Sequence, residues 1–196
     1  MPRVTDLFSV CARLDLDRAW SAYAIGDLSP EFAADCSWHV SDDDPQALVL
    51  LYRGFDPPIL FAIGAGTHLA PLFREIDAPR VSLHLRAEAV AALVTAYRLR
   101  HSIAMWRMVV DPSSFRPANT EGTVPLDETD LDAVAALYDD GGQHQERPTF
   151  FQPWMLGQGT FHGIWDGADL VAVAGTHLFS RELGVCALGN VYTRRD

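Results

Sequence analysis

The pattern of hydrophobic and polar positions predicts that helices and strands alternate along the first part of the chain. Apolar residues return at helical spacing in three ranges: 5–25, 67–76 and 87–100. Short apolar runs or strict alternation, both typical of strands, occupy five ranges: 37–40, 47–52, 59–63, 80–86 and 104–110. The turn residues 54–58 join two of these strands into a hairpin, and Thr67 is the expected N-cap of the next helix.

The second part of the chain opens with a clear helix signal. Asp127 is the expected N-cap, and Asp130 lies at the third helical position, as in a capping box. The apolar stripe that follows consists of Leu131, Val134, Ala135 and Tyr138. We expect this helix to end at Gly141-Gly142 and a shorter helix to span residues 147–158.

Three strands are expected after these helices, over residues 160–165, 170–179 and 185–193. The pair Asp166-Gly167 predicts a tight hairpin between the first two strands. The order helix, helix, strand, strand, strand indicates an antiparallel meander behind a helical cover. The chain as a whole is therefore expected to have an α/β (α+β) fold.

A stretch with three prolines and little periodicity, residues 112–125, separates the two parts and indicates a linker. At 196 residues the chain has room for two small domains. We place these domains at residues 1–116 and 117–196. Both follow a similar order of elements, which suggests two related units.

Composition narrows the classes of partner. The net charge is −11, and such an acidic surface repels phosphates, which argues against a nucleic-acid partner. No apolar run approaches the roughly 18 residues of a membrane span, so no membrane partner is expected. Cys11, Cys36 and Cys186 lack the spacing of a disulfide framework or a metal site. We expect reduced, buried thiols, no bound metal and a cytoplasmic location.

Four segments of the second part carry a family resemblance. They are residues 150–156 (FFQPWML), 159–164 (GTFHGI), 170–177 (LVAVAGTH) and 189–193 (GNVYT). In content and order they resemble the FR47-like branch of the GCN5-related N-acetyltransferases. The resemblance implies two acetyltransferase-like units, of which the first is degenerate and the second is the N-terminal half of a domain. It also implies a mixed, mostly antiparallel sheet with helices on both faces.

The resemblance implies a function as well, the direct transfer of acetyl from acetyl-CoA to a primary amine on a small molecule or peptide. In this family the fourth strand offers unpaired backbone groups to the pantetheine arm and polarises the thioester carbonyl. That strand is 189–193 here, so we expect Asn190, Val191, Tyr192 and Thr193 to bind the cofactor. Val191 and Thr193 would do so through their backbone.

The sequence points less clearly to the residues that would move protons or bind the acceptor amine than to those that would bind the cofactor. We take Asn190 and His177 as catalytic candidates, although His177 equally suits a satisfied structural histidine. Glu182 lies in an expected turn, where a solvated side chain is the simpler interpretation. The loop between the two helices often lines the acceptor site in this family. It supplies the substrate-binding candidates Gln143, His144 and Glu146.

An acetyl-CoA site also needs a loop that binds the pyrophosphate of the cofactor. In the family a Gly-rich loop follows the fourth strand and opens a helix that holds the pyrophosphate. Here only Arg194-Arg195-Asp196 follow, so we expect this chain to be inactive by itself and to self-associate, as a homodimer, through its unpaired sheet edge. Gly64-Ala65-Gly66 is read as a structural turn rather than a working loop. The alternative function is a non-catalytic module for ligand sensing or domain pairing.

Overall fold

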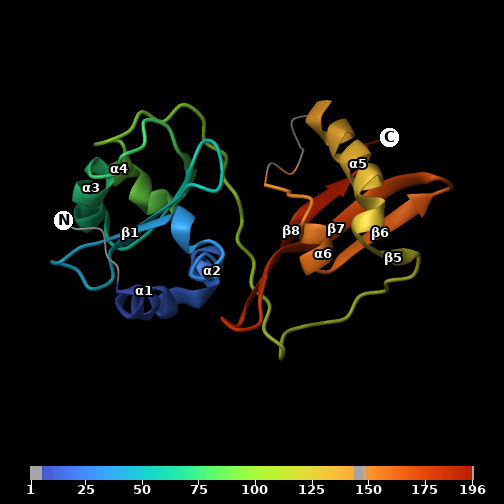
Figure 1. Ribbon diagram of the computed structural model, residues 1–196, viewed down its shortest axis with the longest axis horizontal. Coiled ribbons are helices and arrows are strands. Elements are labelled where there is room, and N and C mark those ends of the chain that lie inside the picture. The colour runs from blue at the N-terminus through green and yellow to red at the C-terminus, as the bar shows by residue number, and fades with distance from the viewer. Residues whose placement is uncertain (1–5, 144–147, 149, 196) are drawn as a thin grey trace. The chain divides into compact units, whose positions relative to one another are not determined.

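The chain folds into two units, each with its own four-stranded sheet. The computed structural model describes residues 6–143, 148 and 150–195 (Figure 1). Unit 1 is Met1–Val109 and unit 2 is Val110–Asp196. Each unit combines its sheet with helices, so the fold is mixed α+β, as the sequence predicts. None of the described helices is long and apolar enough to cross a membrane.

Unit 1 is built on a sheet in the order β1-β2-β3-β4. The first three strands are antiparallel, and β4 runs parallel to β3. The strands are β1 (Cys36–Val40), β2 (Leu48–Tyr52), β3 (Ile59–Ile63) and β4 (Ser82–His84). The helices are α1 (Leu7–Leu14), α2 (Arg18–Gly26), α3 (Gly66–Arg74) and α4 (Val90–Leu93).

Both faces of this sheet are covered. Leu60 and Ala62 belong to a buried cluster with residues of α3 and α4, including Leu69 and Leu93. Phe61 faces the other way and stacks on Trp20 of α2, with the two rings 6.0 Å apart. Strands β2 and β3 are covered on both faces, so their sequences are continuously apolar and do not alternate between apolar and polar residues.

Several expectations for unit 1 need correction. The helix expected over 5–25 is two helices, because Asp17 caps α2 by accepting a hydrogen bond from the Trp20 N–H at 3.0 Å. Ala65, not Thr67, occupies the N-cap of α3. The helix expected over 87–100 shrinks to a 3-10 turn (Ala87–Ala89) followed by α4.

The strand expected over 104–110 is absent, and residues 98–110 form neither helix nor strand. Their apolar side chains are largely exposed. A strand requires a neighbouring strand for its backbone hydrogen bonds, and an apolar run by itself does not provide one.

Unit 2 is an antiparallel sheet in the order β5-β6-β7-β8, and its last three strands form the meander that the sequence predicts. Its strands are β5 (Thr123–Leu126), β6 (Phe161–Asp166), β7 (Asp169–Ser180) and β8 (Val185–Thr193). Its helices are α5 (Leu131–Gln143) and α6 (Met155–Gln158), and a 3-10 turn (Glu128–Asp130) precedes α5.

The local signals in unit 2 are mostly confirmed. Asp127 and Asp130 form the expected capping box at the 3-10 turn that leads into α5, and Gly167 adopts φ 62° in the tight turn between β6 and β7. Three details differ. Strand β5 lies partly inside the range predicted as a linker, α5 continues past Gly141-Gly142, and α6 is shorter than the helix predicted over 147–158.

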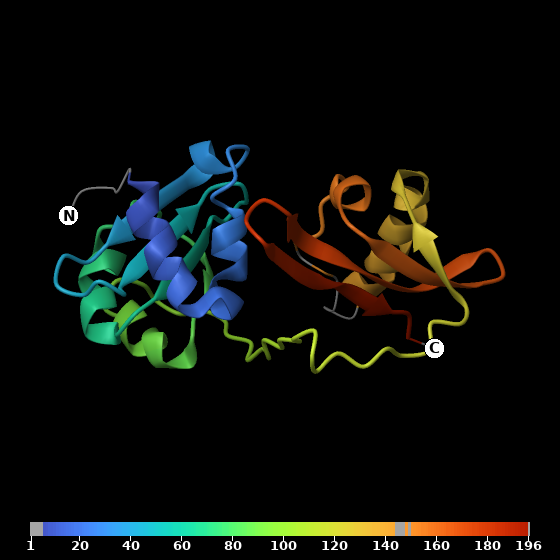
Figure 2. The same ribbon diagram turned by 90° about the horizontal axis from the view of Figure 1, so that it is seen from below.

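Helices α5 and α6 pack on one face of this sheet (Figure 2). Tyr138 of α5 and Met155 of α6 share a buried cluster with Phe161 of β6, Val173 of β7 and Tyr192 of β8. This cluster is the core of unit 2. It fixes the position of β8, the strand that the sequence singles out for function.

Candidate functional site

Strands β7 and β8 do not pair regularly along their length. Val173 pairs with Tyr192, but Gly175 pairs with Gly189, so two residues of β8, Asn190 and Val191, lie opposite one residue of β7. This is a β-bulge, which bends a strand and re-aims its side chains. A second irregularity, with the extra residue on β7 at His177, lies between the pairs Thr176–Leu188 and Leu178–Ala187. Both breaks fall within the predicted site.

Asn190 is the residue at which β8 changes direction. Its φ of 53° is the left-handed conformation, which residues other than glycine seldom adopt, although asparagine does so more readily than most. On the turn side of the bulge, Val185, Ala187 and Gly189 are the less exposed residues, whereas beyond it Asn190 and Tyr192 are buried. The bulge therefore changes the alternation and directs the Asn190 side chain into the core.

Contacts from the two helices hold Asn190 in place. The buried Tyr138 hydroxyl donates a hydrogen bond of 2.7 Å to the Asn190 carbonyl oxygen, and burial raises the pKa of Tyr138. The Asn190 side-chain amide donates to the Met155 Sδ at 3.4 Å, and Asn190 is only 6% exposed. The amide proposed for catalysis thus lies in the interior.

Tyr192 is oriented in a similar way. Its hydroxyl donates a hydrogen bond of 2.8 Å to Oδ2 of Asp140 on α5, and its ring lies in the core beside Val173. Its side chain supports the strand from the helical face. Tyr192 pairs with Val173 of β7, two residues before Arg194, whose N–H bonds to β7; its backbone groups therefore also point toward β7 and not toward the strand edge.

The backbone of β8 beyond the bulge points toward an open edge. The Arg194 N–H donates to the Val171 carbonyl at 2.8 Å, and hydrogen-bonded and non-hydrogen-bonded positions alternate in an antiparallel ladder. Thr193 therefore directs its N–H and C=O away from β7, and the same alternation gives Val191 this direction. In the described sheet β8 is the last strand. The two backbone positions predicted for the cofactor are those that face outward.

His177 lies next to Gly189 on the helical side of the β7–β8 hairpin. A Cβ atom at Gly189 would come within 3.1 Å of His177 Cβ and Nδ1, so the glycine lets the imidazole approach the strand. The Phe150 ring stacks on the imidazole, with the ring centroids 6.3 Å apart. Desolvation by burial lowers the pKa of His177, which keeps the ring neutral at pH 7.

The structure does not gather all of the predicted acceptor residues. Gln143 is the last residue of α5, and its side chain lies outside the described residues, as do His144 and Glu146. Glu182 is exposed in the turn between β7 and β8. The described part of the candidate site thus consists of His177, the bulge and the outer edge of β8.

The Gly64-Ala65-Gly66 turn of unit 1 is tightly packed. Gly64 has φ 116°, and a Cβ atom there would lie 2.6 Å from the Ala47 Cα. A Cβ atom at Gly66 would lie 3.5 Å from the Ala92 side chain. These contacts support the structural interpretation of the turn. The open depression lined by Phe73, Ile76 and Tyr97, about 330 Å³ in volume, contains none of the predicted site residues.

Other parts of the surface offer little additional chemistry. Among the described residues no group of three or more His, Cys, Asp or Glu side chains could hold a metal ion. Cys11, Cys36 and Cys186 are free thiols, but only Cys36 is buried, so the expectation of buried thiols is wrong for the other two. Arg194 forms an ion pair with Asp169 at 3.2 Å.

Sequence reasoning missed the residues that shape the bulge. Tyr138 is predicted only as part of an apolar stripe and Met155 only as part of the segment 150–156, and Asp140 is not singled out. A polar atom on an otherwise apolar helix face was the available signal, because a buried Tyr hydroxyl usually has a hydrogen-bond partner. Comparisons with protein-family models, curated proteins and solved structures find no match.

Proposed function

We propose that unit 2 carries the thioester-binding part of a GCN5-related N-acetyltransferase, which transfers acetyl from acetyl-CoA to a primary amine. One observation supports this proposal above the others. The fourth strand of the unit 2 sheet, β8, is bulged at Asn190, and beyond the bulge the backbone groups of Val191 and Thr193 face an open edge. The motif GNVYT lies at this position of the sheet.

In this proposal, backbone groups of β8 bind the cofactor and buried side chains hold that backbone in place. Acetyl-CoA, when bound, supplies an activated acyl thioester. The outward N–H groups of Val191 and Thr193 suit the amide and carbonyl oxygens of the pantetheine arm and its thioester. Asn190 and Tyr192 would position this backbone through their contacts with Met155 and Asp140.

His177 is the side chain best suited to accept a proton. An attacking amine must lose a proton, and a neutral imidazole is ready to take it. Packing against Phe150 would orient the ring. We keep Gln143, His144 and Glu146 as proposed acceptor contacts for a small-molecule or peptide amine.

The outer edge of β8 suits the pantetheine end of the cofactor. Pyrophosphate binding requires several backbone N–H groups at the start of a helix, which a strand edge does not supply. We propose the cytoplasm as the location, since an exposed thiol such as Cys186 persists best in a reducing compartment.

The test is a nuclear magnetic resonance titration of the ¹⁵N-labelled chain with S-acetylpantetheine, which contains the thioester and lacks the nucleotide. The Val191 and Thr193 amide signals should shift, while those of β1 in unit 1 should not. Thr193→Pro removes one outward N–H at an edge position, where proline is tolerated, and should weaken binding. Thr193→Val retains this N–H and should leave binding unchanged. If a millimolar titration shifts neither amide, the proposal is wrong.

A non-catalytic module is the second candidate, and the packing in unit 1 favours it. Ala47 leaves no room for a side chain at Gly64 in the glycine turn of unit 1, and the Asn190 amide in unit 2 is buried. A chain of this kind would use the fold for ligand sensing or domain pairing. Equal binding of pantetheine and S-acetylpantetheine at Val191 and Thr193 would favour this role, because the strand edge would then not recognise the thioester carbonyl.

A further inference from the structure

A second feature of the chain lies outside the candidate site. Five large side chains between residues 103 and 109 are apolar and exposed, and we call them the apolar strip. They are Ile103 (70% exposed), Met105 (87%), Trp106 (94%), Met108 (89%) and Val109 (65%). Side chains of this size present on the order of 800 Å² of surface, about what each partner buries in a standard-size interface and more than an ordinary monomer exposes in one patch.

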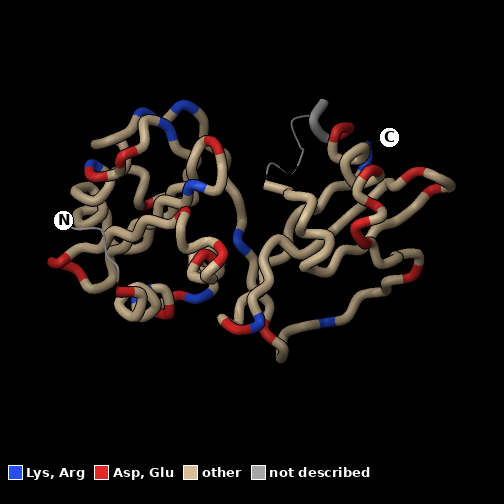
Figure 3. Tube along the Cα trace, viewed as in Figure 1, with Lys and Arg blue, Asp and Glu red and all other residues tan. Residues whose placement is uncertain are grey.

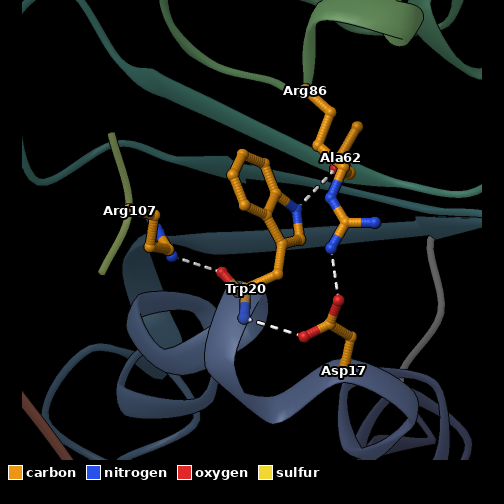
Figure 4. A network of polar contacts seen from close by, with 5 residues as sticks. All are labelled: Asp17, Trp20, Ala62, Arg86 and Arg107. Carbon is orange, nitrogen blue, oxygen red and sulfur yellow. Dashed lines mark hydrogen bonds and ion pairs between the residues drawn. The ribbon is translucent and has the colours of Figure 1, made fainter. Parts of the chain in front are cut away.

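The one charged residue within the strip, Arg107, points back into unit 1. Its guanidinium lies 4.7 Å from the Trp20 ring centroid and 5.1 Å from that of Tyr23. It also donates a hydrogen bond to the Trp20 carbonyl oxygen (Figure 4). Desolvation lowers the pKa of Arg107. The strip is thus held at its centre, and its charge is directed away from the exposed apolar side chains.

The Trp20 ring that anchors Arg107 is itself fixed. Its indole N–H donates to the Ala62 carbonyl at 3.3 Å, and Arg86 lies 4.9 Å from its ring centroid. Arg86 in turn pairs with Asp17, the N-cap of α2 (Figure 4). The strip therefore occupies a defined place on unit 1, although it has no regular secondary structure.

The charges that flank the strip have opposite signs at its two ends. No Asp or Glu lies between Glu88 and Asp111. Figure 3 shows the acidic positions along the backbone in red and the basic ones in blue. Arg100 precedes the strip and Asp111 follows it. If two copies lie antiparallel, each Arg100 meets the Asp111 of the other copy. The stretch 101–110 also lacks Pro and Gly and is rich in β-branched and aromatic residues, which suits strand pairing.

We propose that the apolar strip is a self-association surface on which a second copy of this chain docks in antiparallel orientation. The arrangement is isologous, so the same residues contribute from both copies. Backbone pairing and burial of Trp106 and Met108 stabilise the contact, and the two Arg100–Asp111 pairs set its direction. Anionic nucleic acids and lipids would match the arginines but meet the acidic remainder of a chain with net charge −11.

Sedimentation of the full chain tests this proposal between about 1 and 100 µM, the range over which a micromolar dimer dissociates. The wild type should form a dimer. The double variant Trp106→Glu, Met108→Glu should weaken it at least tenfold. The matched control is Phe8→Glu, since Phe8 is an equally exposed side chain (84%) on α1, and this control should leave the dimer intact.

Each other outcome overturns the proposal. These outcomes are a wild type that stays monomeric, a double variant that stays dimeric, and a Phe8→Glu control that dissociates equally. A monomer that floats with phosphatidylcholine–phosphatidylserine vesicles would assign the strip to a lipid surface instead. Circular dichroism of each variant checks that it is folded, which we expect because the altered side chains are exposed.

A charge swap tests the antiparallel orientation separately. Arg100→Asp and Asp111→Arg should each weaken the dimer, and the two changes combined should restore it. If the combined variant is no tighter than either single variant, Arg100 does not face Asp111 and the proposed orientation is wrong.

Discussion

The hydroxyl of Tyr138 and the carbonyl oxygen of Asn190, 52 residues apart, are joined by a buried hydrogen bond of 2.7 Å. This bond connects the middle of α5 to the one non-glycine residue with positive φ among the described residues. Since Asn190 also donates to Met155 of α6, both helices hold the same point of β8. The shape of the strand edge thus depends on the helical layer behind it.

Tyr138→Phe should destabilise unit 2 and loosen β8. The change leaves a buried carbonyl without its partner, which costs about 1–3 kcal/mol. Hydrogen exchange at the Val191 and Thr193 amides should become faster. The control is Tyr192→Phe, which removes the part-buried bond to Asp140 and should cost less. Equal stability of Tyr138→Phe and the wild type would contradict the role given to this bond.

Asp27 should make unit 1 less stable as the pH rises from about 4 to 7. Burial raises the pKa of this carboxyl from 3.8 to about 7. Below pH 4 the carboxyl is protonated in both states. Between the two pKa values only the unfolded state ionises, so the free energy of unfolding falls by at most about 4 kcal/mol. The loss is complete above pH 7.

Asp27→Asn should remove most of this pH dependence and stabilise unit 1 at pH 8. Urea unfolding at pH 5, 6, 7 and 8 measures it. The control is Asp43→Asn, which removes the same charge from an exposed loop. If the free energies of unfolding of the wild type and Asp27→Asn change in parallel across this pH range, Asp27 is already ionised in the folded chain.

Gly64→Ala should destabilise unit 1 more than Gly122→Ala destabilises unit 2. Both glycines have positive φ, 116° and 82°, so both changes introduce backbone strain of about 1–3 kcal/mol. Only Gly64 has a neighbour in the way, because the new methyl group would lie 2.6 Å from the Ala47 Cα. Thermal unfolding of the two variants compares the costs. Similar melting temperatures would show that the turn has room for a side chain.

Arg107→Gln should release the segment around residue 107 from unit 1. The change removes contacts with the Trp20 and Tyr23 rings that are worth about 1 kcal/mol. Trypsin cleavage after Arg100 in dilute samples should become about fivefold faster, as expected for a change of this size. Arg116→Gln alters an arginine that bonds only to nearby carbonyls in the described structure, so cleavage after Arg100 should not change.

Local signals predict much of this fold. The capping box at Asp127, the turn at Asp166-Gly167 and the hairpin across residues 54–58 each involve residues close in sequence, and the structure confirms all three. The strand expected at 104–110 failed because it depended on a distant partner. The hydrophobic pattern of a segment indicates which side chains it could bury, but it does not indicate whether a partner strand lies beside it.

The candidate site was predictable only in part. The motif GNVYT points to the right strand, but nothing in these letters shows that Asn190 turns inward or that Tyr138 holds it. The bulge results from pairing between β7 and β8, and Tyr138 reaches it from 52 residues away. Non-local contacts of this kind are invisible to periodicity, because they join elements that the pattern treats separately.

The two irregularities of the β7–β8 hairpin cancel each other. Val173–Tyr192 and Phe179–Cys186 belong to the same register, and only Gly175–Gly189 and Thr176–Leu188 are out of phase with it. A descendant that lost one residue from each strand would keep the same turn, ends and core and would have an uninterrupted ladder. The distortion is therefore a removable insertion within an otherwise ordinary hairpin.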